Sequence, residues 1–204
     1  MDKLFFLQNF CNNYEQKNSF LLYYDLLCER QKNINLVSSK SLEDGWKRHF
    51  IDSAQIIKHI FPKNNFNGLI DIGSGAGFPG LVISLLGFSP VYLVETNRHK
   101  AAFLSDVIRI TGSKAKVLNE KIERVVLPEF NFVVSRAFAS LNKLFTILEQ
   151  KRVTNVKCIF PKGRTYNNEI KETKKNWNIR YTTHKSITNS HSKIVIVEDF
   201  KRVK

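Results

Sequence analysis

The stretch Leu69–Gly80 reads LIDIGSGAGFPG and decides the fold. Its apolar start predicts a short buried strand, and the glycines that follow predict a sharp turn where backbone can approach a ligand closely. Pro79 suits a first helical turn, because its missing N–H would be unpaired there, and apolar residues 81–86 continue that helix until Gly87. This order of elements is half of a nucleotide-binding βαβ unit.

The second half of the unit follows directly. Residues 90–95 read PVYLVE, an apolar strand that ends in Glu95. A carboxylate at the tip of the second strand lies beside the glycine loop, where it can accept hydrogen bonds from both ribose hydroxyls of an adenosine. The loop and the acid together predict a ligand that contains adenosine.

Two adenosine ligands compete for this unit. Gly75–Gly80 matches G-x-G-x-x-G, with Glu95 20 residues after Gly75, which favours NAD. Asp71 favours S-adenosylmethionine, because a carboxylate at the strand end attracts an ammonium and a sulfonium and repels a pyrophosphate. No second nucleotide-binding half is evident, which also favours the methyl donor. A glycine turn with a purely structural role is the third alternative.

The spacing after the acid adds a further argument for the methyl donor. Three glycines follow Asp71 at alternate positions and give D-x-G-x-G-x-G: Gly73, Gly75 and Gly77. This pattern resembles motif I of the class I methyltransferases. We therefore expect an α/β fold of the class I, Rossmann-like type that depends on S-adenosylmethionine, with helices on both faces of the sheet.

Charge is unevenly distributed along the 204 residues. Residues 1–102 hold 11 Lys and Arg against 9 Asp and Glu, whereas residues 103–204 hold 21 against 9. Such a surplus is typical of proteins that neutralise phosphates of a nucleic acid. A compositional bias that merely solvates the surface is the alternative, and charge alone does not separate the two.

Cysteine usage and hydropathy point to a reduced, cytoplasmic protein without a membrane span. Cys11, Cys28 and Cys158 are odd in number and far apart, so neither a disulfide framework nor a zinc site is expected. Residues 72–94 carry no charge, but glycines and prolines interrupt them throughout. The N-terminus shows no export signal, and no exposed apolar stripe demands a partner, so we expect a monomer.

The first 62 residues predict a helical extension packed on the core. Residues 2–30 have the apolar spacing of two helices with a break near Asn12. Ser41 is expected to cap a third helix that reaches about Phe61 and ends at Pro62. Residues 63–204 then form the Rossmann-like domain, and the whole chain is one compact unit.

Within the third helix, His49 and Asp52 lie one turn apart on the same face. They either contact a ligand or form a hydrogen-bonded pair that holds the extension to the core. A single histidine is more often structural, so the sequence favours the second interpretation.

The later strand ends carry cations. After Glu95, Thr96 is expected to cap a helix that Gly112 terminates, and a third strand covers 115–119. A fourth strand over 130–135 ends in Arg136, and a helix then runs to about residue 151. Ligands of open α/β sheets bind beyond the strand carboxyl ends, so Arg136 is expected to point at the transferred methyl or the substrate. A structural ion pair is its alternative role.

The last part of the chain adds three strands. A fifth strand over 156–160 leads to Lys162 and Arg164, which are either phosphate contacts or ordinary loop charges. Residues 177–181 and 192–197 are expected to close the sheet as an antiparallel pair.

Several motifs in this order resemble the bacterial small-subunit ribosomal RNA guanine-N7 methyltransferases, also called glucose-inhibited division protein B. They are NINL at 33–36, RHFIDS at 48–53, DIGSGAGFPG at 71–80, SRAFASL at 135–141 and KG at 162–163. The resemblance covers nearly the whole chain. The glycine motif is shared by many methyltransferases, and the R-H-x-x-D-S and S-R-A motifs are the more specific part.

The resemblance implies S-adenosylmethionine as cofactor, S-adenosylhomocysteine as product, and no metal. It implies methylation of a guanine in the decoding-region loop of 16S rRNA in the small ribosomal subunit. The cofactor contacts that it implies are Gly73, Phe78, Ile122, Glu123 and Arg136, in addition to Asp71, Gly75, Gly77 and Glu95 above. Arg48 and Lys121 are expected on the RNA side, with Lys162 and Arg164. Two positions differ from the usual family residue: Glu95 replaces Asp, and Lys121 replaces Arg.

The expected chemistry agrees with what the strand ends contain. Guanine N7 already offers a lone pair, so attack on the methyl needs positioning and no general base. The chain has neither the Asn/Asp-Pro-Pro-aromatic loop of amino-group methyltransferases after the fourth strand nor a cysteine there for attack on a pyrimidine. The alternatives are an NAD-dependent oxidoreductase, a small-molecule methyltransferase, and an RNA-binding protein with a vestigial cofactor pocket.

Overall fold

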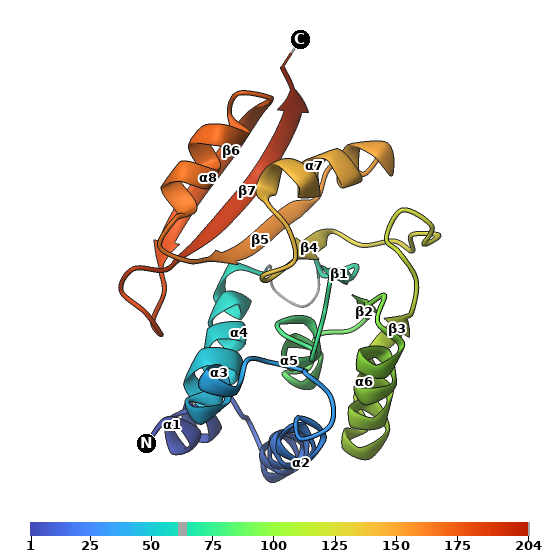
Figure 1. Cartoon of the computed structure of the whole chain (residues 1–204), viewed down its shortest axis with the longest axis vertical. Helices are drawn as coiled ribbons and strands as arrows, with labels where there is room; N and C mark the ends of the chain where they lie inside the picture. Colours follow the sequence, from blue (N-terminus) through green and yellow to red (C-terminus); the bar gives the residue numbers. More distant parts are fainter. Residues whose placement is uncertain (61–64, 204) are drawn as a thin grey trace.

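The computed structural model describes residues 1–60 and 65–203, which fold around a seven-stranded sheet (Figure 1). Its strand order is β3-β2-β1-β4-β5-β7-β6. Neighbouring strands from β3 to β5 are parallel, and β7 inserts antiparallel between β5 and β6. The strands are β1 (Leu69–Ile72), β2 (Val91–Val94), β3 (Lys116–Leu118), β4 (Phe132–Val134), β5 (Lys157–Lys162), β6 (Trp177–Lys185) and β7 (Lys193–Arg202).

Helices cover both faces of the sheet, as the sequence predicts. In Figure 1, α1 to α6 lie on one side and α7 and α8 on the other. Each side has its own apolar core. The helical segments are α1 (Asp2–Asn9), α2 (Tyr14–Arg30), α3 (Ser39–Glu43), η1 (Trp46–Ile51), α4 (Asp52–Ala54), η2 (Gln55–His59), α5 (Gly80–Leu85), α6 (Arg98–Thr111), α7 (Leu141–Gln150) and α8 (Tyr166–Thr173).

Strand β1 lies at the centre and is buried throughout. Leu69 joins the core under α1 to α6, whereas Ile70 and Ile72 join the core under α7 and α8. A strand covered on both faces has no polar side to show, which is why this segment reads as continuously apolar apart from Asp71. The glycine loop that follows β1 therefore starts from a fixed position.

The N-terminal extension packs against that loop through aromatic rings. Phe6, Phe20 and Phe50 are fully buried and meet edge to face, with ring centroids 4.7–6.0 Å apart. Tyr23 of α2 stacks on Phe78 at 5.5 Å, which ties the extension to the turn before α5. The domain boundary expected near residue 62 lies outside the described residues.

The third predicted helix is interrupted. Ser38, not Ser41, precedes α3, and the buried Ser41 hydroxyl donates to the Ser38 carbonyl at 2.7 Å. After Asp44 the chain continues as the π-helical η1, the short α4 and the 3-10 segment η2. Periodicity could not distinguish these winding states, because each keeps an apolar face toward the core. The predicted end at Pro62 lies outside the described residues.

Other boundaries were partly predicted. Asn13 caps α2 by accepting from Gln16 N at 2.9 Å, which confirms the break near residue 12, and Gly112 ends α6 with a φ of +66°. The cap of α6 is Asn97 rather than Thr96, because its side chain accepts from two backbone N–H groups of the first turn. Helix α8 was not predicted. No described helix is long and apolar enough to cross a membrane.

Candidate active site

A cleft of about 970 Å³ opens at the carboxyl ends of the parallel strands. The segments after β1, β2, β3 and β4 each contribute to its wall. The N-terminal extension and the turn between β6 and β7 close the opposite side. This is the place where open α/β sheets bind ligands.

The structure brings most of the predicted residues to this cleft. From the cofactor set, the lining residues are Gly73, Gly75, Phe78, Glu95, Ile122, Glu123 and Arg136. From the RNA set, Arg48 and Lys121 line the same cleft, and both are exposed. Lys162 lies at a neighbouring cavity, and Arg164 is exposed and lines neither.

Glu95 lies beside the glycine loop, as the βαβ argument predicts. Its carboxylate accepts from Gly75 N at 2.8 Å and from Asn97 N at 2.7 Å. Each carboxylate oxygen retains a second lone pair for a ligand hydroxyl. The longer side chain, compared with the Asp usual in the family, therefore still reaches the loop and stays anchored by backbone.

Gly77 has a structural role that the motif alone does not reveal. It does not line the cleft, and its φ is +97°. A Cβ at this position would lie 2.5 Å from Tyr23 Oη, whose hydroxyl donates to the Ala76 carbonyl. The glycine thus lets the extension pack directly on the loop.

Asp71 is fully buried behind the loop rather than in the cleft wall. Its Oδ2 accepts from Gly80 N at 2.9 Å, and its Oδ1 is a buried atom without a partner among the described residues. Burial raises the pKa of this carboxyl to about 7, although hydrogen bonds from Gly80 and Ser74 oppose the shift. Asp71 therefore ties the two ends of the turn together, and its predicted direct contact with a cationic ligand has no geometric support here.

This burial predicts a pH-dependent gain in stability for Asp71→Asn. Between the unfolded pKa of about 3.8 and the folded pKa of about 7, the folded protein binds more protons than the unfolded chain. The wild type therefore loses stability as pH rises through that window, whereas the amide does not titrate. We expect the melting temperature of the variant, relative to wild type, to increase between pH 4 and pH 8. A difference that stays constant with pH would contradict the assignment.

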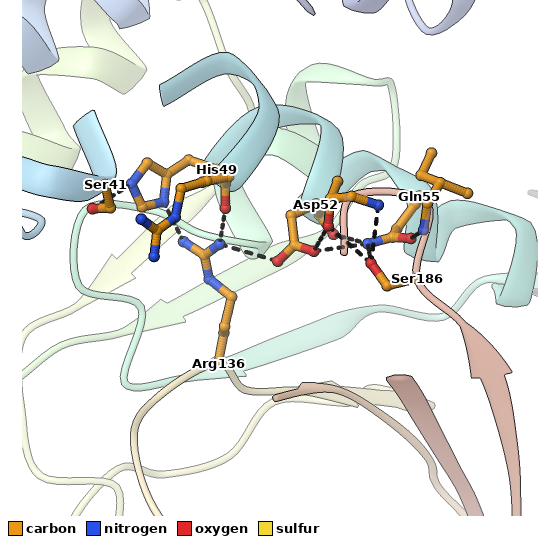
Figure 2. Close-up of polar contacts among 9 residues, drawn as sticks. Ser41, His49, Asp52, Gln55, Arg136 and Ser186 are labelled. Atoms are coloured by element: carbon orange, nitrogen blue, oxygen red, sulfur yellow. Dashed lines mark hydrogen bonds and ion pairs between the residues drawn. The ribbon is translucent and has the colours of Figure 1, made fainter. Parts of the chain in front are cut away.

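Arg136 is held on the cleft floor by groups from the extension (Figure 2). One terminal nitrogen donates to the Arg48 carbonyl at 2.8 Å and lies 3.3 Å from Asp52 Oδ2. The other lies 2.9 Å from His49 Nδ1. Its guanidinium carbon is also 5.2 Å from the centre of the Phe78 ring. Arg136 thus lines the cleft and also forms the alternative ion pair with Asp52, while its expected contact with the methyl or the substrate stays a prediction.

The contacts of His49 fix its tautomer. A guanidinium only donates, so Nδ1 accepts from Arg136, and Nε2–H donates to Ser41 Oγ at 3.0 Å. Burial and the two nearby arginines lower the pKa of His49 to about 3. The ring also stacks on Phe78 at 4.9 Å. His49 is a neutral support for Arg136, a role that the sequence pairing with Asp52 only partly suggested.

Asp52 links Arg136 to the turn between β6 and β7. Its Oδ1 accepts from Thr188 Oγ1 at 2.7 Å and from Gln55 Nε2 at 2.8 Å. Gln55 in turn accepts from Ile187 N at 2.9 Å, and Figure 2 shows it beside Ser186. Thr188 and Gln55 belong to no sequence motif, so the sequence alone does not mark them as part of the site.

Comparison with known proteins places the chain in a family. The profile described as rRNA small subunit methyltransferase G matches residues 16–197. The chain belongs to this family. A member from Rickettsia bellii, named ribosomal RNA small subunit methyltransferase G, is 37% identical over 182 residues, covering 89% of this chain and 93% of its own length. The resemblance drawn from the sequence motifs is thereby confirmed.

Solved structures show the fold of this family member to be that of class I methyltransferases. A variant of MtNAS in complex with S-adenosylmethionine superposes with a TM-score of 0.59 at 15% identity, covering 90% of this chain and 76% of that one. A TehB-like S-adenosylmethionine-dependent methyltransferase from Corynebacterium glutamicum gives 0.57 at 12% identity, covering 88% and 99%. The expected Rossmann-like fold is confirmed.

Proposed function

We propose that this chain transfers a methyl group from S-adenosylmethionine to N7 of a guanine in the decoding-region loop of 16S rRNA. The observation that carries the proposal is the position of Arg136, which lines the cleft together with the glycine loop and the turn between β6 and β7. Membership of the small-subunit rRNA methyltransferase G family supports the class of reaction and substrate.

The residues around the glycine loop fit the methyl donor. Glu95, anchored by Gly75 N, has lone pairs left for the ribose hydroxyls. Ile122 is buried against the cleft and offers an apolar surface to an adenine ring, with Glu123 beside it as an acceptor for the exocyclic amine. Gly73 has a φ of +76°, and a Cβ there would lie 2.3 Å from the Phe138 ring, so the glycine lets Phe138 pack against the loop that lines the cleft. When bound, the donor supplies an electrophilic methyl on a sulfonium.

Cations on the rim of the cleft suit a phosphate backbone. Lys47, Arg48 and Lys121 line the cleft and are exposed at its edge. Exposed lysines and arginines contribute most of the sequence-independent affinity for nucleic acid. We assign Arg48 and Lys121 to the RNA, while Arg164 stays a predicted phosphate contact at the β5 end.

The chain's own residues position the reactants and move no proton. Guanine N7 attacks with its existing lone pair, so the rate gain comes from alignment and from a charge distribution prepared in advance. Arg136 is held by three acceptors, and both nitrogens of His49 are occupied, so neither group is free to act as a base. Arg136 is the residue to which we assign the positioning of the acceptor next to the methyl.

The donor assignment predicts a selective effect on thermal unfolding. S-adenosylmethionine and S-adenosylhomocysteine are expected to raise the melting temperature, because a ligand that binds only the folded state stabilises it, whereas NAD is expected to have no effect. The labelled methyl of the donor should then enter 16S rRNA of small subunits from cells that lack this protein. Stabilisation by NAD alone, or label only in a low-molecular-mass fraction, would overturn the proposal.

A further inference from the structure

A second cavity of about 460 Å³ lies next to the cleft. Five residues line both, namely Asp52, Arg136, Ala137, Phe138 and Ser192, so the two cavities meet at the segment after β4. Its far wall comes from the end of β5, from α8 and from the start of β7. A group that enters this cavity would therefore approach the cofactor cleft past Arg136 and Phe138.

A partly buried ion pair lies in the far wall. Lys162 Nζ is 2.8 Å from Glu169 Oε1, and the two side chains are only 12% and 22% exposed. Glu169 Oε1 also accepts from Leu141 N at 2.7 Å. Both bonds go to Oε1, and among the described residues no donor is bonded to Oε2. The pair thus offers a cavity ligand one ammonium and one carboxylate oxygen, side by side.

We propose that this second cavity holds the acceptor base, extruded from the RNA, and that Glu169 and Lys162 read its Watson–Crick edge as guanine. The inference rests on the proposed function, because it names the pocket for that reaction's acceptor. Enzymes that modify a base commonly take it out of its stack and bind it between apolar surfaces and edge-reading polar groups. A cavity of this size is within the range of small-ligand sites.

The chemistry of the pair selects guanine over adenine. Guanine presents O6 as an acceptor next to the donors N1–H and N2–H, which match the Lys162 ammonium and the Glu169 carboxylate. Adenine presents an amino donor to the ammonium and an unprotonated N1 to the carboxylate, so both contacts become repulsive. N7 lies on the adjacent Hoogsteen edge, next to O6, and the proposal turns that edge toward Arg136 and the cofactor cleft.

Phe138 supplies the apolar surface for the base. Phe138 is 41% exposed, although most large aromatic residues of this protein are buried, and it lines both cavities. The preceding Ala137 has a φ of +56°, which turns the chain sharply after the strand end. An exposed ring where the two cavities meet is suited to stacking on a base.

A double-mutant cycle between protein and base tests the proposal. Wild type and Glu169→Gln are assayed on small-subunit RNA that carries guanine or inosine at the methylated position. Inosine lacks the 2-amino group and keeps N7, O6 and N1–H. For the wild type, inosine is expected to lower kcat/KM about tenfold or more. For Glu169→Gln, guanine and inosine are expected to differ by less than about twofold, because the carboxylate that reads the amino group is gone.

Two controls separate base reading from a structural role. Glu172→Gln changes an exposed carboxylate on the same helix, paired with Lys175 on the surface, and should keep the wild-type preference. Affinity for S-adenosylhomocysteine and the melting temperature identify variants that are merely destabilised. If Glu169→Gln keeps the full preference for guanine, the pocket assignment is wrong and the methyltransferase proposal stands. If the wild type methylates neither RNA, both fall.

Discussion

Arg136→Lys is expected to reduce the rate of methyl transfer to rRNA by about 100-fold or more. A lysine offers one ammonium in place of a planar fork, so it cannot reach the Arg48 carbonyl, Asp52 and His49 together. The reacting groups would lose their alignment, and a misplacement of about 1 Å is enough for such a loss. Single-turnover transfer from labelled donor measures the effect, and filter binding of the RNA should remain close to wild type.

Arg164→Lys is the matched control for this substitution. Arg164 is also a strand-end arginine, but it is exposed and lines neither cavity. We expect its replacement by lysine to leave the transfer rate within about twofold, because lysine keeps the positive charge that its predicted phosphate contact needs. Equal rates for wild type and Arg136→Lys would remove Arg136 from the site.

Gly77→Ala is expected to destabilise the fold by about 3 kcal/mol or more, from left-handed backbone strain together with overpacking. The new methyl would lie 2.5 Å from Tyr23 Oη and 3.0 Å from Leu104. Tyr23 is fully buried and stacks on Phe78, so it has no space into which to retreat. Urea unfolding followed by fluorescence measures the loss.

Gly75→Ala separates the backbone contribution from the steric one. Gly75 has a φ of +57°, and the nearest atom to its added Cβ lies 4.0 Å away. Only the left-handed conformation is penalised there, which costs about 1–2 kcal/mol. If the two variants lose equal stability, the close packing of the extension on the glycine loop is not what makes Gly77 necessary.

The sequence predicts those parts of the site that depend on strand ends. Gly73 and Gly75, Glu95 and Arg136 each follow an apolar strand, and parallel strands deliver their carboxyl ends to one edge. Their meeting in the cleft therefore follows from topology alone. The family motifs added the expected chemistry to this geometry.

The hydrogen bonds that hold Arg136 could not be predicted from the sequence, because they join segments that lie far apart in the chain. The R-H-x-x-D-S motif marks Asp52, but Asp52 bonds Thr188, 136 residues away in the chain, and no local pattern marks Thr188 as part of the site. The strand position of Asp71 likewise could not reveal that Gly80 N would bind its carboxylate from behind the loop, and its expected contact with a cationic ligand stays a prediction. Lys162 was expected as a phosphate contact or an ordinary loop charge, and the sequence did not reveal its ion pair with Glu169 of the unpredicted α8.

Mapping the methyl on the RNA tests the central claim most directly. Small subunits from cells that lack this protein are incubated with the chain and S-adenosylmethionine, and N7-methylguanine is located by chemical cleavage and primer extension. We predict one new cleavage, at a guanine of the decoding-region loop of 16S rRNA. Intact donor binding with no cleavage at any guanine would contradict the account.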